Sequence, residues 1–86
     1  MGSDEKIFLD AREMEHPVPL ERAIGALRQL DETNYFYMIH RKNPIPLIEL
    51  AQGQGFKVCS RQNDDGIWHI VVTRSEKLDP EALCNV

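Results

Sequence analysis

Apolar positions follow two different spacings along the first half of the chain. Short apolar runs over 7–10 and 35–40 are long enough for strands and too short for stable helices. After each run, apolar residues recur three and four positions apart, which is the spacing of an amphipathic helix. The pattern therefore predicts strand, helix, strand and helix over 7–51. The helical positions are Leu20, Ala23, Ile24, Leu27 and Leu30 in the first helix and Leu47, Leu50 and Ala51 in the second.

The second half of the chain has the pattern of a hairpin. Residues 56–62 and 67–74 are both rich in strand-forming side chains. Between them lies Asn63-Asp64-Asp65-Gly66, which carries the Asp-Gly signal of a tight turn. The predicted order of elements is therefore β-α-β-α-β-β.

Both predicted helices follow a Pro-x-Pro segment, Pro17 and Pro19 in the first case and Pro44 and Pro46 in the second. Proline suits the first turn of a helix, so these four residues are interpreted as structural. Strand–helix–strand crossovers are right-handed, which places both helices on one face of a four-stranded sheet. We therefore expect a two-layer α/β sandwich in which 10–19 and 40–46 line one sheet edge, the usual place for a ligand.

Composition restricts the class of protein. The 86 residues fit one domain, with 42% hydrophobic and 28% charged side chains. We expect a disordered N-terminus over 1–6, a folded domain over 7–74 and a flexible C-terminal tail over 75–86. The net charge of −4 argues against nucleic-acid binding. The sequence shows no membrane span and no secretory signal, so we expect a cytoplasmic protein.

Several motifs resemble a known family. Leu9-Asp10-Ala11-Arg12 followed by His16-Pro17-Val18-Pro19-Leu20 resembles the opening of the TusA/SirA-like sulfur carriers. The second half resembles an uncharacterised TusA-related branch, domain of unknown function 2249. The resemblance implies a mixed four-stranded sheet whose last strand is antiparallel to the others, and a relation to sulfur metabolism. The second-half motifs are His40-Arg41, Pro44-x-Pro46-Leu47, Gly55-Phe56 and Asp65-Gly66.

The residue that defines the sulfur carriers is replaced in this chain. Their Cys-Pro-x-Pro cysteine holds a persulfide, and His16 stands at that position here. An imidazole forms no persulfide, so the resemblance does not carry sulfur transfer to this protein. We expect a neutral His16 beside the positive end of a helix dipole, either as a ligand-binding group or in loop packing and helix capping.

Basic side chains collect at the predicted sheet edge. Arg12, Arg41 and Lys42 should lie near two helix N-termini, whose free N–H groups also attract anions. Together with His16 and His40 they form a candidate site for a small anionic ligand or a partner protein. The alternative is that these are solvated loop charges. The favoured hypothesis is a binding or accessory module and not an enzyme.

A second hypothesis is a metal-dependent or redox accessory protein. His16, His40 and Asp10 are candidate ligands for a divalent metal, although their distance in sequence gives no ligand spacing to test. No other cofactor is expected.

Cys59 and Cys84 form no Cys-x-x-Cys pair, so they favour neither a disulfide scaffold nor a zinc site. Cys59 alternates with Lys57 and Arg61, whose charge should lower its pKa, and a sulfur relay through it is a third hypothesis. The alternative is an inert strand cysteine, and Cys84 is interpreted as an exposed tail thiol.

The strand predicted over 67–74 is apolar on both faces. Helices cover only one face of a two-layer fold, so the other face is a candidate surface for a homodimer. The alternative is a harmless set of exposed strand-forming residues.

Overall fold

The computed structural model describes residues 5–86 and contains four strands and three helices. Residues 1–4, the first part of the predicted disordered N-terminus, lie outside the described residues. The elements are β1 (Glu5–Asp10), α1 (Val18–Leu27), β2 (Asn34–His40), α2 (Ile45–Gly53), β3 (Lys57–Gln62), β4 (Trp68–Thr73) and α3 (Pro80–Leu83).

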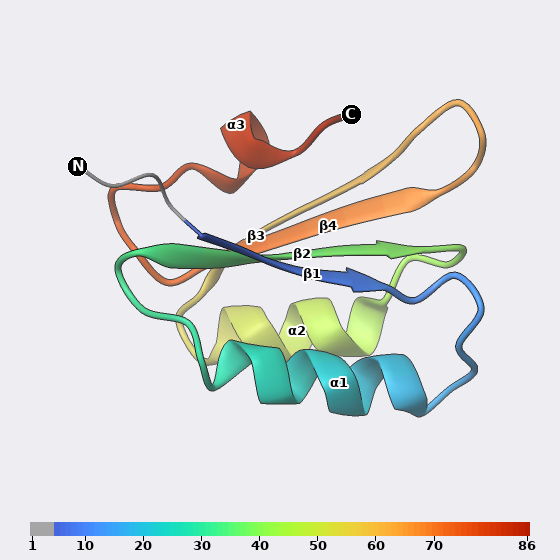
Figure 1. Cartoon of the computed structure of the whole chain (residues 1–86), viewed down its shortest axis with the longest axis horizontal. Helices are drawn as coiled ribbons and strands as arrows, with labels where there is room; N and C mark the ends of the chain where they lie inside the picture. The colour runs from blue at the N-terminus through green and yellow to red at the C-terminus, as the bar shows by residue number, and fades with distance from the viewer. Residues whose placement is uncertain (1–4) are drawn as a thin grey trace.

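The strands form one mixed sheet in the order β1-β2-β4-β3. β1 pairs in parallel with β2, and β4 is antiparallel to both β2 and β3. The last strand therefore runs against the other three, as the family resemblance implies. Figure 1 shows α1 and α2 side by side on one face of this sheet. The predicted α/β sandwich and its element order are confirmed.

The main core lies between the sheet and these two helices. β2 and β4 contribute Phe36, Met38, Ile70 and Val72, and α1 and α2 contribute small residues such as Ala23 and Ala51, which let the helices approach the sheet closely. No helix within residues 5–86 is long and apolar enough to cross a membrane.

The opposite face of the sheet is covered by the C-terminal segment, which differs from the flexible tail expected over 75–86. α3 packs on β3 and β4 (Figure 1), and a second buried cluster forms beneath it from Tyr37, Cys59, Val71 and Cys84. Asp79 caps this helix by accepting a 3.0 Å hydrogen bond from the N–H of Glu81. The sheet face proposed for a homodimer is therefore largely occupied by the chain itself.

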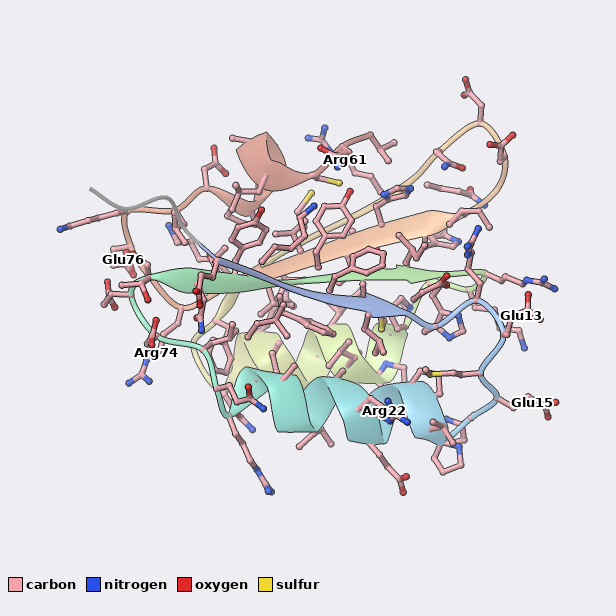
Figure 2. The ribbon with its side chains drawn as sticks, viewed as in Figure 1. Glu13, Glu15, Arg22, Arg61, Arg74 and Glu76 are labelled. Carbon is pink, nitrogen blue, oxygen red and sulfur yellow. The ribbon has the colours of Figure 1, made fainter. Side chains whose placement is uncertain are left out.

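Polar contacts hold this C-terminal segment on the sheet. Arg61 of β3, seen on the α3 side of the sheet in Figure 2, forms a 2.9 Å ion pair with Glu81. Its guanidinium also donates to the carbonyl oxygen of Val86, at 3.3 Å. The N–H of Asn85 donates to the hydroxyl of Tyr37 at 2.9 Å. These partners are distant in sequence, so local pattern gave no sign of them.

The described N-terminus is also more ordered than expected. Glu5 and Lys6 belong to β1, where they pair with Asn34 and Tyr35 of β2. The N–H of Glu5 donates to the carbonyl oxygen of Thr33 at 3.0 Å, so the strand begins before its first apolar residue. Backbone pairing with β2 is the physical reason, because it needs no apolar side chain.

We expect Tyr37→Phe to lower the free energy of unfolding by about 1–3 kcal/mol, because it removes the hydroxyl that bonds to the half-buried ring of His69 and to the N–H of Asn85. Urea denaturation measures this change. Tyr35→Phe is the matched control, since no hydrogen bond of the Tyr35 hydroxyl is found within residues 5–86. Equal effects of the two substitutions would contradict the assigned role of Tyr37.

Candidate functional site

The candidate site lies where the two parallel strands end and the two long helices begin. β1 and β2 are neighbours in parallel register, so Asp10 and Ile39 lie opposite each other at this edge. Figure 1 shows α1 and α2 both starting at the same end, beside the arrowheads of β1 and β2. The crossover connections therefore bring 11–17 and 41–44 together.

A cavity of about 170 Å³ opens between the first turns of α1 and α2. Most of its lining is apolar, with polar side chains from three residues predicted as site residues, His16, His40 and Lys42. His16 and Lys42 are exposed, whereas His40 is half-buried. The full lining is His16, Pro19, Leu20, Met38, His40, Lys42, Asn43, Pro44, Pro46 and Leu47.

The prolines at the helix starts leave one free backbone donor in each first turn. Pro19 and Pro46 have no N–H. The residue before each proline donates its N–H to a carbonyl oxygen just upstream. These bonds run from Val18 to Glu15 and from Ile45 to Asn43, both at 2.9 Å. The next N–H groups, of Leu20 and Leu47, find no acceptor among residues 5–86. Both residues line the cavity, and N–H groups of a first turn point out of the helix N-terminus. The lining of the cleft thus includes two residues whose first-turn N–H groups have no acceptor among residues 5–86.

His40 presents a defined tautomer to the cleft. Its Nδ1 accepts a 2.9 Å hydrogen bond from the N–H of Arg41, which leaves the proton of the neutral ring on Nε2. Burial, assisted by the charge of Lys42, lowers the pKa of His40 below its usual value of 6.5. The ring is therefore neutral at pH 7 and acts as a hydrogen-bond donor through Nε2.

Arg12 and Arg41 lie at this edge but not in the cavity lining. Arg12 donates two hydrogen bonds to the carboxylate of Asp10, at 2.9 and 2.8 Å, and these bonds lower the pKa of Asp10 to about 2. Arg41 forms a 2.9 Å ion pair with Glu13, which extends from the β1–α1 loop in Figure 2. Both guanidinium groups are paired with a carboxylate outside the cavity, whereas Lys42 belongs to the cavity lining.

The metal hypothesis gains no support from this geometry. Asp10 is bonded to Arg12 and does not line the cavity that His16 and His40 share. In the part of the chain from Glu5 to Val86, no three histidine, cysteine, aspartate or glutamate side chains are grouped to hold a metal ion.

The two cysteines are placed differently from the expectation. Cys59 does face away from α1 and α2, but α3 covers it, and burial raises its pKa, an effect that outweighs the charge of Arg61. Cys84 is buried rather than exposed. The predicted lowering of the Cys59 pKa is therefore wrong, and neither thiol lies in the cleft lining.

The sequence pattern gave no indication of a polar network on the face opposite the cleft. The Oδ1 of Asn63 accepts from the N–H groups of Asp65 and Ile67, both at 2.9 Å, so its amide nitrogen donates to Nε2 of His69 at 3.2 Å. Nδ1 of His69 must then carry the proton and donate to the Tyr37 hydroxyl at 2.7 Å. The position of Asn63 before Asp-Asp-Gly predicts the turn, but no local pattern predicts the hydrogen bond from Asn63 to His69 in β4.

We expect His40 and His69 to be neutral at pH 7 in opposite tautomers, with the proton on Nε2 of His40 and on Nδ1 of His69. Long-range proton–nitrogen NMR correlations distinguish the two forms in one spectrum, so each histidine is the control for the other. The same tautomer in both rings would contradict the hydrogen-bond assignment.

We also expect the free energy of unfolding to decrease as the pH falls from 7.5 to 5.5. Burial lowers the pKa of His40 and His69 in the folded chain, so the unfolded chain binds these protons first and is favoured by acid. Urea denaturation over this pH range measures the slope, and His40→Gln should reduce it. A stability that increases on acidification would contradict the placement of these rings.

Comparisons with known proteins agree with this architecture. The profile of the family described as "Uncharacterized conserved protein (DUF2249)" matches residues 8–74. The crystal structure of a SirA-like protein from Desulfitobacterium hafniense aligns with a TM-score of 0.68 and 25% identity, covering 81% of this chain and 100% of that one. Comparison with curated protein sequences finds no match. The profile covers most of the chain and the fold is SirA-like, so the protein belongs to the DUF2249 family.

Proposed function

We propose that the protein is a binding module whose cleft takes a small ligand with an anionic head and an apolar body. The observation that carries this proposal is a pair of backbone donors without an acceptor among residues 5–86, the N–H groups of Leu20 and Leu47, two residues that line one apolar cavity. Both belong to helix first turns, where the helix dipole also favours negative charge. Lys42 adds a full positive charge at the same opening.

The lining favours a ligand that is not a bare inorganic ion. Leu20, Met38 and Leu47 present apolar surface to the cavity, and a hydrated ion would leave that surface in contact with water. A volume of about 170 Å³ fits a small organic acid better than a protein segment. A small anionic molecule is therefore favoured over a partner protein for this cleft.

The proposed function differs from that of the sulfur carriers, because His16 stands where they have the cysteine that holds the persulfide. No thiol lines the cleft among the described residues, and the Cys59 thiol lies under α3 on the other face of the sheet. The neutral Nε2–H of His40 donates a hydrogen bond but forms no persulfide. The site therefore has the groups to bind and orient an anion.

Benzoate is a suitable probe because it joins a carboxylate to an apolar ring, and benzamide is its uncharged counterpart. We expect benzoate to shift the backbone amide NMR signals of Leu20 and Leu47, because their N–H groups gain an acceptor. Benzamide should shift them much less. Lys42→Met keeps the apolar stem but removes the charge, and should weaken benzoate binding about fivefold to tenfold.

Lys77→Met is the matched control for this substitution. Lys77 is exposed and follows β4 at the sheet end where Thr73 pairs with Tyr35, opposite the end that carries the cleft. Its replacement should leave benzoate binding unchanged. Equal shifts with benzoate and benzamide, or equal losses in the two variants, would rule out an anion site in this cleft.

A further inference from the structure

The two thiols of the chain lie on the sheet face opposite the cleft. Cys59 belongs to β3, and Cys84 directly follows α3. Both are free and buried, although they are far apart in the sequence. The fold of the C-terminal segment over the sheet therefore removes both thiols from solvent.

The same fold makes the thiols neighbours. Cys59 and Cys84 belong to one buried cluster with Tyr37 and Val71, and α3 contacts β3 directly. The Sγ of Cys84 lies 3.9 Å from the carbonyl oxygen of His69 in β4, and Cys59 pairs with Val71, two positions further along the same strand. A paired arrangement of this kind distinguishes the site from a single buried cysteine.

The segment that carries Cys84 contributes no strand to the sheet. α3 has only four residues, and its surface contacts are exposed polar bonds such as that between Arg61 and Glu81. Short elements held in this way open locally at a lower free energy than a core strand. When the segment is closed, burial keeps Cys59 protonated, and its thiolate becomes available when the segment opens.

We propose that Cys59 and Cys84 form a redox site at which a peroxide produces an intramolecular disulfide. One thiolate attacks the peroxide O–O bond, which gives a sulfenic acid and releases hydroxide, protonated to water. The second thiol attacks that sulfur, forms the S–S bond and releases a second water. In total, two thiols lose two hydrogens and two electrons, and hydrogen peroxide is reduced to two waters.

The disulfide fixes the C-terminal segment to β3. It closes a loop of about 25 residues and so restricts the unfolded chain, which raises the stability of the fold. For a domain of this size we expect the oxidised protein to melt about 10 °C or more above the reduced protein. Hydrogen exchange of the amides over 80–85 should slow as well, because the segment no longer opens.

The test treats the full chain with hydrogen peroxide and measures the intact mass, the melting temperature and the non-reduced tryptic peptides. Trypsin cuts after Lys57, Arg61 and Lys77, so the two cysteines fall in separate peptides, 58–61 and 78–86. We expect a mass lower by two hydrogens, a linked pair of these peptides and a higher melting temperature. A reductant should reverse all three changes.

Cys59→Ala and Cys84→Ala are the matched variants, and neither should show the mass loss or the rise in melting temperature. The wild-type peptide map does not depend on how well these variants fold. Disulfide-linked dimers, oxygen added to a single cysteine without a linked peptide, or an unchanged mass after peroxide would each overturn the proposal.

Discussion

The structure depends on burying both faces of the central strands β2 and β4. Within β2, Phe36 and Met38 pack under the helices while Tyr37 between them faces the other way, and Val71 in β4 alternates in the same manner. A strand buried on both faces requires a layer on each side of the sheet. α1 and α2 form one layer, and the C-terminal segment forms the other. The short α3 is therefore part of the fold, since without it Tyr37 and Val71 would meet water.

The same arrangement separates two kinds of chemistry. The parallel pairing of β1 and β2 places both helix N-termini at one sheet edge, where the N–H groups of Leu20 and Leu47 have no acceptor among residues 5–86. That edge binds an anion in the function proposed above. The other face holds the two thiols beside Tyr37 and His69, in a buried cluster that α3 closes. Among the described residues, no thiol lines the cleft, and the helix beside the thiols, α3, has only four residues.

Local pattern predicted the strands, the two long helices and the cleft edge because periodicity, Pro-x-Pro and Asp-Gly act through neighbours in sequence. It failed where the outcome depends on distant partners. Arg41 looked available for an anion, but its guanidinium bonds to Glu13, which lies 28 positions away in the sequence. The basic side chains of Lys57 and Arg61 suggested a lowered pKa for Cys59. However, α3 buries this thiol, and burial raises its pKa more than the charge of Arg61 lowers it. α3 itself is too short to show a periodicity, and it is held by contacts with β3 and β4.

The two sites share β2 but not a movable element. Met38 and His40 line the cleft, whereas Tyr37 bonds to the C-terminal segment on the other face. Between them lies β2, a strand that is hydrogen-bonded on both edges, to β1 and to β4, and is therefore held in place by its neighbours. Coupling between sites needs an element with two states that both sites bias. The C-terminal segment is such an element for the thiols, but the cleft is built from β2 and the two loops before α1 and α2. The anion binding and the thiol oxidation proposed above are therefore expected to be independent of each other.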